Sequence, residues 1–143
     1  MSFIKYVQFA LFTSMLSPAL ALAELPGIRV VVSNLSPTTG TVEVSLFDSE
    51  ESYLKEPYLQ QSGVVGEDGV FETEFVGLSE GEYAVVVVHD ANDNGKLDNG
   101  FLGFNGESYG YSNNLKPWFG RPGFEKAKIS VTLPDTLVEI NLD

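Results

Sequence analysis

The sequence contains no cysteine, so disulfide bonds, cysteine zinc sites and thiol nucleophiles are excluded. Histidine is nearly absent too, since His89 is the single one. Basic side chains are also scarce: 8 lysines and arginines stand against 20 aspartates and glutamates, and the formal net charge is −12. Such an acidic surface repels phosphate backbones and attracts cations, so we expect no nucleic-acid partner. The fold must rest on its apolar core, with a bound metal as a further source of stability.

The N-terminal apolar run is shorter than the roughly 20 residues that span a bilayer. This run, at residues 6–16, follows Lys5 and precedes the small-residue sequence Ala-Leu-Ala at 21–23. A basic residue, a short apolar run and a small-residue site are typical of a secretory signal peptide. We therefore expect residues 1–23 to be a cleaved signal peptide. Residues 24–143 should be one domain, exported to the periplasm or the exterior and not membrane-spanning.

Short segments of alternating apolar and polar residues dominate the rest of the chain, separated by Gly, Pro, Asn and Asp. This period of two predicts strands. The predicted strands are residues 28–32, 41–47, 70–76 and 83–89, and a weaker one at 63–65. Two closing strands follow, the first with Ala127, Ile129, Val131 and Leu133 on one face and the second with Val138, Ile140 and Leu142 on one face. A short helical turn is expected near residues 50–54. About seven short strands with little helix favour a single antiparallel two-layer β-sandwich, transthyretin-like or immunoglobulin-like, with a small barrel as the alternative.

Oxygen-bearing side chains alternate in the nine residues after the strand at 83–89, Asp90-Ala91-Asn92-Asp93-Asn94-Gly95-Lys96-Leu97-Asp98. A calcium loop has this spacing: side-chain ligands at positions 1, 3 and 5, glycine at position 6, a backbone carbonyl at position 7 and a further ligand at position 9. The matching residues are Asp90, Asn92, Asn94, Lys96 through its carbonyl, and Asp98. The alternative is a plain connection, because Asn, Asp and Gly also suit turns.

The flanks of this loop differ from those of an EF-hand. Position 12 is Phe101 rather than a bidentate glutamate, and a strand precedes the loop. Asp93 and Glu107 are the candidates for a missing ligand. With two neutral asparagines among the ligands and no bidentate glutamate, we expect a dissociation constant on the order of 10⁻⁴ to 10⁻³ M if no distant carboxylate joins the ligands. Calcium would then be a structural ion that orders the start of the following loop.

The connection at residues 99–122 is long and rich in aromatic residues. A loop of this length either carries a function or is disordered, and its aromatic content favours a folded loop. The candidate binding surface for a saccharide or a peptide consists of Tyr109, Tyr111, Asn113, Asn114 and Trp118. Alternatively, the rings fold inward and cap the core, since an exposed aromatic cluster promotes aggregation.

The chain lacks a recognisable catalytic constellation. Residues 106–110 match the Gly-x-Ser-x-Gly nucleophile motif, but that motif requires a strand-to-helix turn and a later histidine, whereas His89 precedes Ser108. A histidine at a strand end is more typical of a hydrogen-bonding element. Pairs among 20 acidic residues arise by chance and define no glycosidase site. We therefore expect a non-catalytic module, and an envelope-associated hydrolase with its site at residues 99–122 is the competing class.

The stretch at residues 81–98, Gly-Glu-Tyr-Ala-Val-Val-Val-Val-His-Asp followed by Asn92-x-Asn94-Gly-Lys-Leu-Asp98, resembles the exported bacterial family called domain of unknown function 2141. Gly103 and the stretches at residues 110–114 and 119–127 resemble the rest of its pattern. The resemblance implies a secreted β-sandwich, similar to transthyretin-like and carboxypeptidase-regulatory domains, with no assigned reaction. The chain departs from the pattern at Asn105, near which family members are expected to carry a proline.

Overall fold

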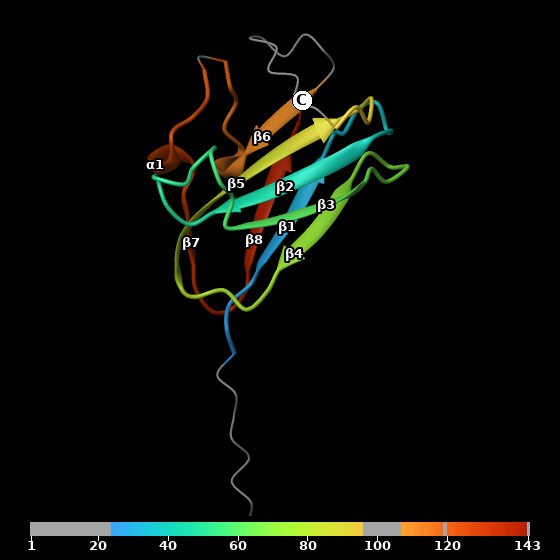
Figure 1. Cartoon of the computed structure of the whole chain (residues 1–143). Helices are drawn as coiled ribbons and strands as arrows, with labels where there is room; N and C mark the ends of the chain where they lie inside the picture. The colour runs from blue at the N-terminus through green and yellow to red at the C-terminus, as the bar shows by residue number, and fades with distance from the viewer. Residues whose placement is uncertain (1–23, 96–106, 119, 143) are drawn as a thin grey trace, which may run out of the picture.

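The computed structural model describes residues 24–95, 107–118 and 120–142, and strands make up most of its regular structure. In chain order the elements are β1 (Ile28–Ser33), β2 (Thr41–Phe47), β3 (Leu59–Val64), β4 (Phe71–Phe75), β5 (Gly81–Asp90), β6 (Ser108–Tyr111), η1 (Ser112–Asn114), α1 (Phe124–Ala127), β7 (Ile129–Val131) and β8 (Thr136–Asn141). One sheet has the order β4-β1-β8, and the other has the order β3-β2-β5-β6 with β7 also paired to β5. The sheets pack as two layers (Figure 1), which confirms the predicted all-β sandwich.

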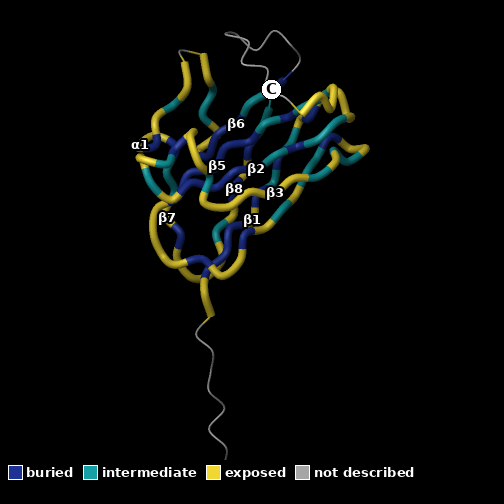
Figure 2. The backbone as a smooth tube through the Cα atoms, viewed as in Figure 1, coloured by how far each residue is buried: buried dark blue, intermediate teal, exposed yellow. Residues whose placement is uncertain are grey.

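Alternating side chains place one face of each sheet in a shared core. In β1, Ile28, Val30 and Val32 are fully buried, while Arg29 between them is exposed. The same alternation in the other strands fills the space between the sheets, with Val42, Val44, Leu46, Val85, Val87, Val138 and Ile140. Burying each such side chain stabilises the fold by about 1.5–3 kcal/mol. Figure 2 shows these buried segments inside a rim of exposed turns.

A second, smaller core covers part of the outer face of the β3-β2-β5-β6 sheet. Its members are Phe47, Tyr53, Ala84, Val86, Tyr111, Phe124 and Ala127. The rings of Phe47 and Tyr53 meet edge to face at 5.4 Å, and those of Tyr53 and Phe124 at 5.8 Å. Because this cluster covers one face and the main core the other, β5 is buried on both faces, as its uninterrupted apolar run predicts.

The fold differs from the prediction in three details. There are eight strands among the described residues rather than about seven, since β6 forms within the stretch predicted to be a loop. The pairing is not wholly antiparallel, because β8 runs parallel to β1. Ala127, predicted to lie in the first closing strand, instead ends the short helix α1. The expected helical turn near residues 50–54 does form, with hydrogen bonds from the Tyr53 N–H to the Ser49 carbonyl at 3.1 Å and from the Glu56 N–H to the Ser52 carbonyl at 2.9 Å. Within the described residues, η1 and α1 are the helical segments, and neither could span a membrane.

The strand register determines what meets at the end of β5. Thr41 of β2 pairs with Asp90, and Ser108 of β6 pairs with His89. Directly opposite residues of antiparallel strands have neighbouring side chains on the same face. The start of β2, the end of β5 and the start of β6 therefore lie at the same end of the sandwich, and the predicted calcium loop begins there.

Candidate functional site

The chain curls around the carboxylate of Asp90 directly after β5. The Gly95 N–H donates a hydrogen bond to Asp90 Oδ2 at 3.0 Å, and the Asn94 N–H donates to Asn92 Oδ1 at 3.1 Å. The turn needs left-handed backbone at Asp93 and Gly95, whose φ values are 54° and 64°. Asparagine, aspartate and glycine tolerate that conformation best, so the local composition explains the turn.

The turn between β1 and β2 holds this loop from the other side. The Thr39 hydroxyl donates to the carbonyl of Ala91 at 3.3 Å, and the Thr41 hydroxyl donates to Asp93 Oδ1 at 2.6 Å. Gly40 lies so close to the loop that an added Cβ would overlap the Asp90 carbonyl oxygen. The loop is therefore positioned by residues about fifty positions earlier in the chain.

His89 lies on the opposite face of β5 from Asp90 and is fully buried. Its Nε2 lies 2.8 Å from the carbonyl oxygen of Thr39. A carbonyl oxygen only accepts, so Nε2 carries a proton and donates it, and Nδ1 is the other ring nitrogen. This Nδ1 is buried and makes no hydrogen bond within the described residues. Ser108 pairs beside His89 from within strand β6, not from the strand-to-helix turn that the nucleophile motif requires.

The second carboxylate oxygen of Asp90, Oδ1, differs from the first in making no hydrogen bond with any described residue. Asp90 Oδ1 is buried and has no hydrogen-bond partner in the part of the chain that the structure describes. An unpaired buried acceptor costs about 1–3 kcal/mol, and more when it is charged. A cation beside Oδ1 would remove that cost, so the donor chemistry of Asp90 fits a metal ligand.

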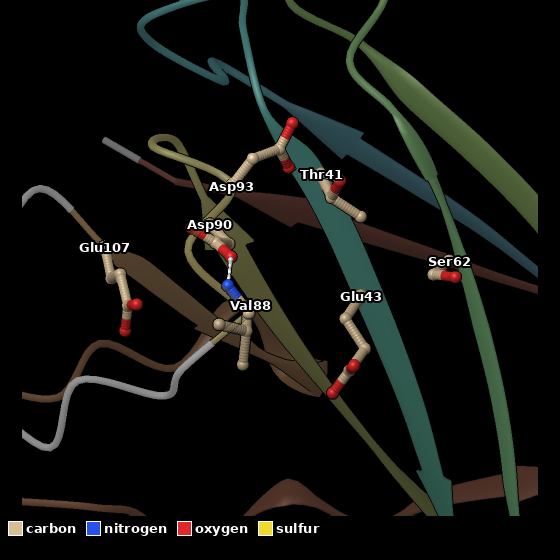
Figure 3. Close-up of a pocket in the computed structure, with 8 residues that line it drawn as sticks. Thr41, Glu43, Ser62, Val88, Asp90, Asp93 and Glu107 are labelled. Atoms are coloured by element: carbon tan, nitrogen blue, oxygen red, sulfur yellow. Dashed lines mark hydrogen bonds between the residues drawn. The ribbon is translucent and has the colours of Figure 1, made fainter.

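An acidic pocket of about 390 Å³ opens next to Asp90. Four acidic residues line it, Glu43, Asp90, Asp93 and Glu107, and Figure 3 shows that their carboxylates are spread along the pocket. They come from β2, the end of β5, the loop after it and the residue before β6. Among the described residues, no three His, Asp or Glu side chains gather closely enough to hold a metal by themselves. A metal at Asp90 would therefore need amide or carbonyl oxygens as well.

The predicted ligands fall into two groups. Asp90, Asn92 and Asn94 follow one another in the observed turn, and both asparagines are exposed. Asn92 Oδ1 already accepts from Asn94, but an amide oxygen has a second lone pair for a ligand. Lys96 and Asp98 lie outside the described residues. The structure thus describes the first half of the predicted loop, where these three residues share one turn.

The two candidates for an extra ligand both line the acidic pocket. Asp93 is held by Thr41, as described above. Glu107 is only 6% exposed, and its Oε2 accepts a hydrogen bond from the Tyr109 hydroxyl at 3.0 Å. Burial, followed by the hydrogen bond and the charge of Glu107, raises the pKa of Tyr109 to about 12. The phenol therefore stays protonated and keeps Glu107 in place at the rim.

The predicted aromatic surface is divided between internal contacts and solvent. Tyr111 is 2% exposed and belongs to the second core. Asn113 Nδ2 donates to the carbonyls of Lys126 and Lys128 at 2.9 and 3.1 Å, and Asn114 Oδ1 accepts from the Asn141 N–H at 3.0 Å. Tyr109 is partly buried, whereas Trp118 is 78% exposed. Four of the five side chains therefore make contacts within the domain, whereas Trp118 is largely exposed.

Sequence patterns gave no signal for Ser112, which is fully buried. Its hydroxyl accepts from the Val85 N–H at 2.9 Å and donates to the carbonyl of Ala127. This single side chain links β5 to α1 behind the second core. A serine that follows a tyrosine in a polar stretch looks like a surface residue, so only the three-dimensional structure reveals this role.

A protein-family model described as an uncharacterized protein conserved in bacteria (DUF2141) matches residues 30–139. The matched range includes the whole loop at residues 90–98 and runs from β1 into β8. No curated protein and no solved structure matches the chain.

Proposed function

The chain belongs to the DUF2141 family of bacterial proteins, and from that premise we propose an exported, non-catalytic β-sandwich module with a structural calcium ion in the loop at residues 90–98. The observation that carries the proposal is the buried, unpaired Oδ1 of Asp90. The other oxygen of the same carboxylate accepts from Gly95, the sixth residue of the loop, where calcium loops need a glycine for their sharp turn.

Calcium suits this donor set better than other metals do. The available donors are carboxylate, amide and carbonyl oxygens, which are hard ligands. Zinc and copper favour thiolate and imidazole, but the chain has no cysteine and its single histidine is hydrogen-bonded to Thr39 on the other face of β5. Magnesium demands a rigid octahedron, whereas a short turn with two exposed asparagines supplies an irregular, flexible shell.

The ion would stabilise the end of the sandwich where the loop begins. Glu43, Asp93 and Glu107 line the same hollow as Asp90, and their negative charges favour a divalent cation bound at Asp90. At 10 mM calcium and a dissociation constant of about 10⁻⁴ to 10⁻³ M, binding stabilises the folded state by about 1.4–2.7 kcal/mol. For a domain of this size, that corresponds to a rise in melting temperature of about 5–10 °C.

Thermal unfolding of the chain from Glu24 in 10 mM CaCl₂ or in EDTA tests the proposal. Asp90→Asn keeps the shape of the side chain but removes its charge, and Glu80→Gln removes an exposed charge outside the pocket as a matched control. We expect the calcium-dependent rise in the wild type and in Glu80→Gln, and its loss in Asp90→Asn. No rise in the wild type, or an equal rise in Asp90→Asn, would refute the site.

Export has its own test, because the argument for it rests on residues 1–23 alone. Edman sequencing of the protein recovered from the native bacterium should begin at Glu24. A protein that retains its first residues would contradict cleavage. The non-catalytic role is supported by the burial of His89 and by the position of Ser108 inside a strand.

A further inference from the structure

A second hollow lies on the outer face of the sheet that contains β2, β5 and β6. It measures about 330 Å³, and we call it the outer groove. Ser45 of β2 and Val88 of β5 form its floor, because they alternate with core residues and so point away from the core. Gln60 of β3 lines one side, and Tyr109 of β6 lines the other. From β3 to β6 there are three strand spacings of about 4.8 Å, so the groove crosses roughly 14 Å of sheet.

The outer groove brings together two positive charges from distant parts of the chain. Lys55 and Arg121 both line it. This convergence is uncommon in a chain with 8 basic and 20 acidic side chains. Arg29, which pairs with Glu72, and Lys128, which pairs with Glu82 and Glu125, do not line the groove. The local charge therefore favours an anionic ligand, in contrast to the acidic pocket beside it.

The positions of these cations are set by their surroundings. Lys55 Nζ donates to the carbonyl of Glu51 at 2.9 Å, which places the ammonium group and leaves it two further donors. The guanidinium of Arg121 lies close enough to two tyrosines to influence them. Burial raises the pKa of Tyr111, and the positive charge of Arg121 acts in the opposite direction. Phe47 and Tyr111 of the second core line the groove together with these two cations.

The rest of the groove is suited to a sugar ring. Val86 and Val88 offer an apolar floor, and the partly buried ring of Tyr109 adds an aromatic wall. Gln60 Nε2 donates to Ser45 Oγ at 3.1 Å, so the Ser45 hydroxyl is oriented and can still donate its own proton. An apolar floor with a few directed polar groups is the general composition of a small-ligand site.

Glu43 limits which anion fits. It lines both the outer groove and the acidic pocket, so it marks the end of the groove opposite the cations. A ligand with carboxylates along its whole length would meet repulsion there. A ligand with one carboxylate at one end and neutral hydroxyls at the other avoids this repulsion.

We propose that the outer groove binds an acidic saccharide, with a uronate carboxylate between Lys55 and Arg121 and a neutral sugar ring over Val88. The site does not require calcium. An acidic peptide is less suitable, because the sheet face supplies hydroxyl, amide and aromatic groups across a broad open floor and only one end is cationic.

NMR titration of the ¹⁵N-labelled chain from Glu24 in EDTA tests this proposal. The probe is cellobiouronic acid, which has one glucuronate and one neutral ring, and cellobiose is the matched neutral sugar. We expect amide shifts at Ser45, Val86 and Val88 with millimolar cellobiouronic acid and at least fivefold weaker binding of cellobiose. Cellobiose binding as tightly, no shifts up to 20 mM probe, or a glutamate dipeptide binding as tightly would each overturn the proposal.

Three variants test whether the uronate carboxylate of the probe binds between Lys55 and Arg121. Arg121→Gln and Lys55→Gln should each weaken cellobiouronic acid by about fivefold, the upper range for an exposed ion pair, and leave cellobiose unchanged. Lys126→Gln removes a positive charge from outside the groove and should leave both affinities unchanged. Equal weakening by all three variants would show a general charge effect and overturn the site. Since EDTA removes calcium throughout, a negative result here is independent of the calcium loop.

Discussion

Replacing Gly40 with alanine tests whether the β1–β2 turn packs directly against the backbone of Asp90 and Ala91. Gly40 has a φ of +83°, and an added Cβ would lie 2.7 Å from the Ala91 Cα and 2.8 Å from its carbonyl carbon, with the Asp90 carbonyl oxygen closer still. Gly77 supplies a matched control, because its φ is +71° and an added Cβ there would meet nothing within 4 Å. The two alanine variants therefore share the same backbone strain, and only Gly40→Ala adds a steric clash.

The magnitudes follow from these two contributions. An L-residue in the left-handed region costs about 1–2 kcal/mol. The gain from a less flexible unfolded chain, about 0.4–1 kcal/mol, offsets part of that cost. We therefore expect Gly77→Ala to lower the free energy of unfolding by about 1 kcal/mol. At Gly40 the clash is with backbone atoms, and overpacking adds about 1–3 kcal/mol, so the total loss should be about 3 kcal/mol.

Urea unfolding measures both losses on one scale. With a slope of about 1–3 kcal/mol per molar urea, the extra 2 kcal/mol at Gly40 lowers the midpoint by about 1 M more than Gly77→Ala does. If the two variants were destabilised equally, to within about 0.5 kcal/mol, the close contact between the turn and the loop would be wrong.

Further predictions concern two buried hydroxyls. Ser112→Ala leaves the Val85 N–H and the Ala127 carbonyl without their partner, and it should cost about 1–3 kcal/mol in urea unfolding; a smaller loss would remove the role of Ser112 as a link. The Tyr53 hydroxyl is buried without a hydrogen-bond partner in the described residues, so Tyr53→Phe should leave stability at pH 7 unchanged or raise it by up to about 1 kcal/mol. Burial raises the pKa of Tyr53 from 10.0 to about 12. Between pH 10 and 12 the phenol ionises in the unfolded chain but stays protonated in the folded one, so the free energy of unfolding falls over this range and is unaffected by Tyr53 ionisation below pH 10. Tyr53→Phe should accordingly reduce the loss of stability measured between pH 9 and pH 11.5, and an unchanged loss would contradict this assignment.

The strands that the sequence predicts best are those with a continuous buried face. β2 is predicted at its observed bounds, because Val42, Val44 and Leu46 alternate with more polar residues. β3 is predicted only weakly, since its residues are mostly exposed and it is ordered by pairing with β2. β6 is missed, because its four residues include Gly110, whose missing side chain leaves room for Ile140 and Leu142.

The parallel pairing of β8 with β1 also has no local signal. The two strands lie at opposite ends of the described chain, and their pairing depends on which edge of β1 remains open once β4 has taken the other. Periodicity identifies strands and their buried faces, but it does not identify partners.

The candidate site shows the same division between local and long-range information. Alternating oxygens and a glycine predict a turn around Asp90, and the bonds from Gly95 and Asn94 form that turn. The contacts from Thr39 and Thr41 come from another part of the chain and have no sequence signal. The unpaired oxygen of Asp90 is likewise visible only in three dimensions.

Isothermal titration of the EDTA-treated chain from Glu24 with calcium tests the central claim most directly. We expect one calcium per chain with a dissociation constant on the order of 10⁻⁴ to 10⁻³ M, and no measurable binding in Asp90→Asn. The absence of heat or of saturation in the wild type up to 10 mM calcium, or an unchanged isotherm in Asp90→Asn, would contradict a calcium site at the end of β5.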